Sequence, residues 1–125
     1  MGETYLHSDL TSKILSSFYK VYNKLGYGFL EKVYENALKI ELESEGLLVE
    51  KQKPIAVFYN EHLVGEYFAD LIVDNKVILE LKASEFIRDE HEFQLINYLK
   101  ATEIEVGLLL NFGKKPEFKR KVFSN

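Results

Sequence analysis

The sequence contains no cysteine, which excludes disulfide bonds and thiolate metal sites. It also lacks any uncharged apolar run of the roughly 18 residues that a membrane-spanning helix needs. The first residues show no basic start followed by an apolar segment, so no signal peptide is predicted. These absences are compatible with a reducing compartment, and we expect a cytoplasmic protein that does not contact the membrane.

An excess of positive charge is missing as well. The formal net charge is -4, whereas a protein that coats a nucleic-acid duplex should be basic. Any contact with nucleic acid must therefore be local, or must be assisted by metal ions or partners. The sequence shows no internal repeat and no linker rich in proline, glycine or serine. Its 125 residues fit a single domain spanning positions 1–125.

Hydrophobic periodicity predicts an alternation of helices and strands. Apolar residues recur at helical spacing over 8–25, 30–45 and 89–102, and extended segments are predicted over 47–59, 63–73, 76–83 and 106–112. The basic segment 113–125 could dock as a last short strand or as a helical turn. Three successive strands followed by a helical crossover to a buried strand imply a mixed sheet with helices on both faces.

The most unusual stretch runs from Asp70 to Lys82. Glu80 and Lys82 interrupt an otherwise apolar strand, and Asp70 lies on the strand before it. Buried acids and lysines are rare unless they are paired or bound to a metal. Because Glu80 and Lys82 are two residues apart, both should point to the same face of the sheet.

The turn at Asp74 decides whether the two acids meet. A two-residue connection would place Asp70 opposite Leu79, and a three-residue connection would place it opposite Glu80. The sequence fits either connection. With the longer one, Mg²⁺ or Mn²⁺ would join the two carboxylates, and Lys82 could hold an attacking water or steady negative charge on a phosphate. The alternative is an ordinary ion pair at the edge of a sheet.

Two further features extend this candidate site. Gln94 and Tyr98 are one turn apart on one helix face, where they could hold a phosphate or a metal-bound water; the alternative is a solvated helix face. Glu31 could add a third carboxylate from another helix. The alternative for Glu31 is a favourable interaction with the positive end of its own helix.

The segment from Gly28 to Tyr34 matches the pattern of the GxxExxY protein family. Together with the D…ExK and QxxxY patterns, in this order, the chain resembles the PD-(D/E)XK nuclease superfamily and, within it, the RecB-like branch. The resemblance implies an α/β, three-layer, restriction-endonuclease-like core with a mixed four-stranded sheet flanked by helices. It implies a metal site formed by Asp70, Glu80, the backbone carbonyl of Leu81 and Glu31. It also implies a catalytic Lys82, with Gln94 and Tyr98 supporting the site or contacting the substrate backbone.

The expected function is that of a Mg²⁺- or Mn²⁺-dependent nuclease. It would hydrolyse phosphodiester bonds of DNA or, as a second choice, RNA by means of a metal-activated water. One alternative is a nuclease fold retained as a binding or assembly module with little or no catalysis. Another is a metal-dependent phosphoryl hydrolase acting on small nucleotides. A chain of this length has limited surface for gripping a duplex, so a homodimer or a protein partner is a further hypothesis.

Overall fold

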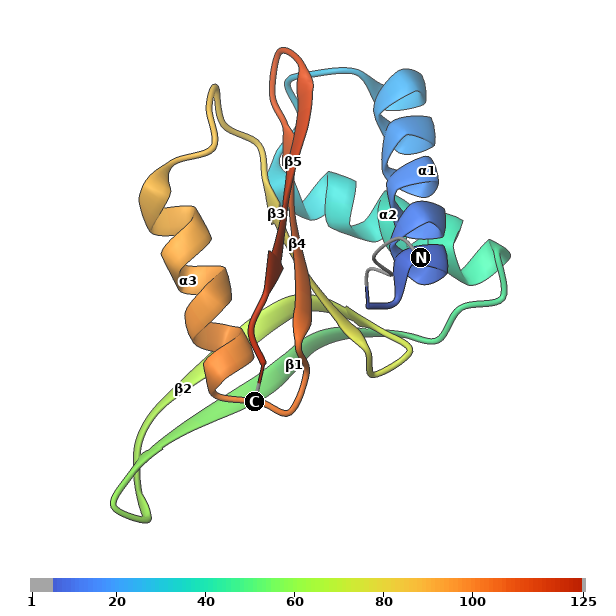
Figure 1. The fold of residues 1–125 in the computed structure, drawn as a ribbon. Coiled ribbons are helices and arrows are strands. Elements are labelled where there is room, and N and C mark those ends of the chain that lie inside the picture. Colours follow the sequence, from blue (N-terminus) through green and yellow to red (C-terminus); the bar gives the residue numbers. More distant parts are fainter. Residues whose placement is uncertain (1–5, 125) are drawn as a thin grey trace, which may run out of the picture.

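The protein forms a five-stranded mixed sheet with helices on both faces. The computed structural model describes residues 6–124, and the strands follow the order β1-β2-β3-β4-β5 across the sheet. Helices α1 and α2 cover one face and α3 covers the other (Figure 1). The elements are α1 (Ser8–Leu25), α2 (Glu31–Ser44), β1 (Val49–Tyr59), β2 (His62–Val73), β3 (Val77–Lys82), α3 (Asp89–Lys100), β4 (Val106–Phe112) and β5 (Pro116–Val122).

This architecture confirms the predicted fold class and corrects the number of strands. The C-terminal segment adds β5, which pairs antiparallel with β4 from Val106–Val122 to Phe112–Pro116. The expected sheet of four strands is therefore one strand too small. Every β5 side chain is exposed or half-buried, so this strand has no apolar pattern that would predict it. Its backbone hydrogen bonds to β4 determine its position.

Two cores lie on opposite faces of the sheet. Leu79 and Leu81 of β3 pack beneath α1 and α2, whereas Ile78 packs beneath α3. All seven residues of β4 are buried, as expected for a central strand that is covered on both faces. Among residues 6–124, none of the helices is long and apolar enough to span a membrane.

The hairpin formed by β1 and β2 reaches beyond the rest of the sheet, below α3 in the view of Figure 1. Asn60 and Glu61 form its tip with positive φ angles of 48° and 68°, a conformation that asparagine tolerates better than most residues. The two strands pair over ten positions, from Val49–Val73 to Tyr59–His62. The hairpin therefore forms a projecting arm beside α3.

The connection between α1 and α2 explains the glycine and the tyrosine of the GxxExxY pattern. Gly26 and Gly28 have φ angles of 73° and 116°, values that favour glycine. The Tyr34 hydroxyl donates a hydrogen bond to the Gly26 carbonyl at 2.6 Å and accepts one from the Phe29 N–H at 3.1 Å. Its ring stacks on Phe112 at 4.2 Å between centroids. Tyr34 thus fixes the point where α2 begins.

We expect Tyr34→Phe to lower the free energy of unfolding by about 1–3 kcal/mol, because it removes the two hydrogen bonds that the buried Tyr34 side chain makes to the connection. Thermal unfolding measures the change. Tyr59→Phe, at an exposed position of the hairpin, is the matched control. Equal stability of the two variants would contradict the role given to the Tyr34 hydroxyl.

Candidate active site

The connection between β2 and β3 contains three residues. Val73 pairs with Val77 and Leu71 with Leu79, so Asp74, Asn75 and Lys76 form the turn. Asp74 and Asn75 have positive φ angles of 53° and 55°, which these residue types tolerate. Continuing the register places Asp70 opposite Glu80, so the longer connection that the metal-site hypothesis required is present.

The two acids occupy the point where β2 and β3 separate. Their backbone ladder ends at the Leu71–Leu79 pair. Beyond it, the Asp70 N–H donates to Oε2 of Glu80 at 2.9 Å, and the Leu81 N–H donates to Oδ2 of Asp70 at 2.8 Å. Side-chain carboxylates thus replace the ladder bonds between the strands. This fork holds both carboxylates in a fixed, adjacent position.

The fork is an unfavourable place for two negative charges. Glu80 is only 4% exposed, and burial together with the charge of Asp70 raises the pKa of the Glu80 carboxyl to about 8. Burial also raises the pKa of Asp70, although the hydrogen bond from the Leu81 N–H opposes that shift. A proton or a cation is therefore needed to neutralise the pair at neutral pH.

Gln52 and Glu35 belong to the same site, although neither was predicted from the sequence. Gln52 lies opposite Asp70 on β1, has a φ angle of 54°, and is not paired in the ladder. Its Nε2 lies 3.5 Å from Oδ1 of Asp70 and 3.3 Å from each carboxylate oxygen of Glu35. Glu35 is 6% exposed, and its charge raises the pKa of both Asp70 and Glu80. A glutamine within a strand and a second acid one turn after Glu31 were the available signals.

Glu31 and Lys82 lie at the end of β3. Glu31 begins α2, is exposed, and its Oε2 accepts a hydrogen bond from the Ala83 N–H at 3.4 Å. Lys82, half-buried, precedes Ala83, and its positive charge lowers the pKa of both Asp70 and Glu80. The structure thus brings Lys82 toward the carboxylate pair and places Glu31 at the edge of the site.

Gln94 and Tyr98 lie on α3, which covers the face of the sheet opposite to α1 and α2. The Gln94 side-chain amide donates to the Tyr98 hydroxyl at 3.0 Å. Burial raises the pKa of Tyr98 to about 12, with further contributions from the charges of Glu80 and Asp70. Tyr98 also packs in one core with Ala69, the neighbour of Asp70, and with Ile78 of β3. The Leu81 side chain packs in the core beneath α1 and α2, and the role of its carbonyl as a metal ligand stays a prediction.

The chemistry of the fork fits a hard divalent cation. Within residues 6–124, no group of three or more histidine, cysteine, aspartate or glutamate side chains is arranged to hold a metal ion. However, Mg²⁺ is usually bound by one or two carboxylates, with waters and substrate phosphates as the other ligands. Asp70 and Glu80 supply two adjacent carboxylates of this kind, and a cation would relieve the repulsion between them.

A mixed sheet between helical layers, with an Asp on one strand and Glu-x-Lys on its neighbour, defines a restriction-endonuclease-like core. The family model of the PD-(D/E)XK nuclease superfamily matches residues 8–121. The chain belongs to this superfamily.

A solved structure shares the fold. The crystal structure of SSO0001 aligns with a TM-score of 0.60 at 17% sequence identity. The alignment covers 95% of this chain and 61% of that protein, so this chain spans less than two thirds of its length. No curated protein sequence matches the chain.

Proposed function

We propose that the protein is a Mg²⁺- or Mn²⁺-dependent nuclease that hydrolyses phosphodiester bonds of DNA or, as a second choice, RNA. The carrying observation is the carboxylate pair of Asp70 and Glu80, held at the fork of β2 and β3 by two hydrogen bonds to backbone amides. We also assign the whole of 1–125 to one domain in the GxxExxY family and the RecB-like branch. The arrangement of Gly28 and Tyr34 around the start of α2 supports the GxxExxY assignment, and the pair of Gln94 and Tyr98 on α3 supports the RecB-like branch.

The proposed reaction gives each side chain of the site a role. Asp70 and Glu80 would hold the cation, with Glu31 and the Leu81 carbonyl as proposed further ligands. When bound, the cation would supply the positive charge that activates water and neutralises the phosphate. Lys82 orients the attacking water or steadies negative charge on the phosphate. Gln94 and Tyr98 position the substrate backbone from α3. Gln52 and Glu35 keep Asp70 in its orientation.

Calorimetric titration of Mn²⁺ into the wild type and into Asp70→Asn tests the cation site. Asparagine keeps an oxygen that can accept the hydrogen bond from the Leu81 N–H, so the variant should fold. We expect it to lose Mn²⁺ binding by at least about 100-fold, since charged carboxylates supply most of the affinity for a hard cation. The control is Glu66→Gln, which removes the same charge from an exposed position on β2.

The same samples are then tested for cleavage of nicked, linear and single-stranded DNA and of RNA. Cleavage by the wild type and by Glu66→Gln, but not by Asp70→Asn, supports the nuclease. Mn²⁺ binding without cleavage of any substrate favours the binding or assembly module. Equal Mn²⁺ binding by Asp70→Asn and the wild type rejects the carboxylate site itself.

A further inference from the structure

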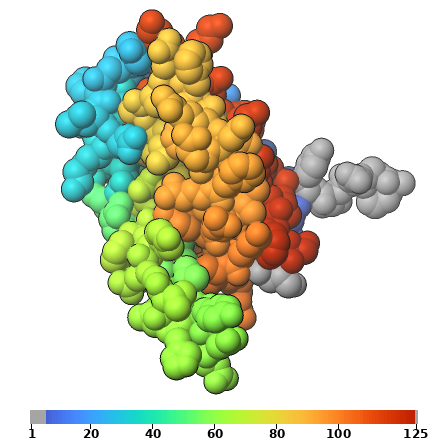
Figure 2. Space-filling model, turned by 90° about the vertical axis from the view of Figure 1, so that its left-hand side faces the viewer, coloured from blue at the N-terminus to red at the C-terminus, as the bar shows by residue number. Residues whose placement is uncertain are grey.

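A groove runs between the projecting β1–β2 hairpin and α3. Its volume is about 740 Å³, and Figure 2 shows the hairpin and α3 on one face of the molecule. The lining residues come from both sides: Ala56, Val57, Phe58, Tyr67, Glu90, Phe93, Gln94, Asn97, Tyr98, Lys100 and Ala101. A pocket of this size lies in the range that accommodates small organic molecules, so one or two nucleotide bases can fit.

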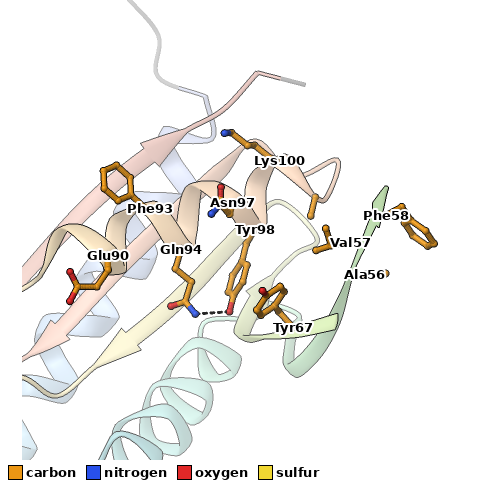
Figure 3. A pocket seen from close by; sticks show the side chains of 11 residues that line it. Ala56, Val57, Phe58, Tyr67, Glu90, Phe93, Gln94, Asn97, Tyr98 and Lys100 are labelled. Carbon is orange, nitrogen blue, oxygen red and sulfur yellow. Dashed lines mark hydrogen bonds between the residues drawn. The ribbon is translucent and has the colours of Figure 1, made fainter. Parts of the chain in front are cut away.

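Four of the eleven lining residues are aromatic. Figure 3 shows Tyr67 and Tyr98 near the middle, with Phe93 and Phe58 toward opposite ends. The centroids of the Tyr67 and Tyr98 rings are 5.6 Å apart. Tyr67 is 50% exposed and Phe93 is 64% exposed, so both offer ring surface that the fold does not use. Accessible aromatic rings of this kind stack on nucleic-acid bases.

The charges of the lining favour bases over phosphates. The lining contains one negatively charged residue, Glu90, and one positively charged residue, Lys100, so its formal charges cancel. The Lys100 ammonium lies 5.8 Å from the centroid of the Phe123 ring. A channel that followed a phosphate backbone would instead be basic. Gln94 and Asn97 add neutral amides that can donate to and accept from base edges.

The groove lies beside the proposed catalytic centre. Gln94 and Tyr98 line it, and Tyr98 packs in one core with Ala69 and Ile78, which lie on the same two strands as Asp70 and Glu80. Tyr67 is also on β2, three residues before Asp70, or roughly 10 Å along the strand. A nucleotide chain whose phosphate lies at the carboxylates can therefore place a neighbouring base in the groove.

The geometry points to a binding site for unpaired bases in this groove, which makes single-stranded or splayed nucleic acid the substrate class of the nuclease. The inference rests on the proposed function. Bases within a duplex are stacked on one another and cannot offer their faces to Tyr67 and Phe93 unless they leave the helix. The groove therefore selects substrates that have free ends, flaps or unpaired segments beside the scissile phosphate.

Fluorescence anisotropy with a labelled oligothymidylate, in the presence of EDTA to prevent cleavage, tests this inference. Tyr67→Ala and Phe93→Ala should each weaken binding about tenfold, the usual loss for one stacking ring. The controls are Tyr27→Ala and Phe86→Ala, whose rings are 56% and 64% exposed and lie outside the lining. Phe93→Ala changes an exposed helix position, so this variant stays informative if Tyr67→Ala fails to fold.

Three comparisons complete the experiment. An abasic strand of the same length should bind the wild type more weakly than oligothymidylate binds Phe93→Ala, because it offers no base to either ring, and a blunt duplex should bind more weakly than the single strand. The slope of log affinity against log salt should be the same for wild type and Phe93→Ala, because phosphate contacts are unchanged.

Groove variants that bind like their controls would overturn the inference, as would equal binding of abasic and base-bearing strands by the wild type. Either result leaves the nuclease intact if wild-type protein still cleaves DNA with Mn²⁺ and Asp70→Asn does not. If the wild type neither binds Mn²⁺ nor cleaves nucleic acid, the proposed function is rejected, and the groove inference is rejected with it.

Discussion

Replacing Glu80 by glutamine should raise the free energy of unfolding at pH 8 by an amount on the order of 3 kcal/mol. In the folded protein, burial and the charge of Asp70 raise the pKa of Glu80 from 4.5 to about 8. The folded state therefore binds a proton that the unfolded state releases at lower pH. This contribution to stability is fully present below pH 4.5 and is lost as the pH rises through about 8. The glutamine amide has no proton to lose, and its oxygen can still accept from the Asp70 N–H.

Thermal unfolding between pH 5 and pH 8 measures the effect. The wild type should melt roughly 10 °C lower at pH 8 than at pH 5, while Glu80→Gln should show a much smaller change. Glu66→Gln, with its exposed side chain, should follow the wild type. Saturating Mn²⁺ should restore most of the wild-type stability at pH 8, because the cation replaces the lost proton. Parallel pH profiles for wild type and Glu80→Gln would show that the buried carboxyl is not protonated at neutral pH.

The sequence predicted the elements of the fold and left one decisive feature open. The apolar patterns located the helices and four of the strands, because burial on one face leaves a period and burial on both faces leaves a continuous apolar run. The pairing of Asp70 with Glu80 depended on whether the turn had two or three residues. Both asparagine and aspartate adopt the positive φ angles found at Asp74 and Asn75, so composition alone could not select the connection.

Residues that act through an irregular backbone were the hardest to predict. Gln52 reaches Asp70 and Glu35 because its φ angle is positive and its ladder pairing is absent. Neither property has a signature in the sequence EKQKP. Ala69 and Leu71 illustrate the same difficulty: they are two residues apart, yet they lie in opposite cores. The strict alternation of a regular strand breaks at Asp70, where the site is formed.

Asn111 shows how a strong apolar pattern can hide a polar contact. It lies within the run VGLLLNF and is completely buried. Its amide accepts a hydrogen bond from the Ser84 N–H at 3.1 Å and donates one to the Ser84 carbonyl at 2.9 Å. Asn111 pairs with Lys82 across the parallel strands β4 and β3. It therefore fixes the chain directly after the lysine, a contact that a period-based interpretation cannot reveal.

Lys82→Met should lower the rate of DNA cleavage by a factor on the order of 100 to 1,000, the usual loss when one stabilising charge is removed from an active site. Methionine keeps most of the apolar stem and removes the ammonium. The lysine lowers the pKa of Asp70 and Glu80, so its charge acts at the fork. Calorimetry should show Mn²⁺ binding that is equal to or tighter than that of the wild type, because a repelling positive charge has been removed.

A loss of cleavage without a loss of Mn²⁺ binding in Lys82→Met would distinguish a nuclease from a nuclease-fold binding module. The control, Lys76→Met, removes the same charge from an exposed turn position of the same hairpin, and it should leave both properties unchanged. The loss in Lys82→Met should appear in kcat more than in KM, since the ammonium is assigned to the developing charge rather than to substrate affinity. A rate within twofold of the wild type would remove Lys82 from the chemistry. Gln94 and Tyr98, which are joined by a hydrogen bond on α3, would then be the next side chains to test for orienting the water.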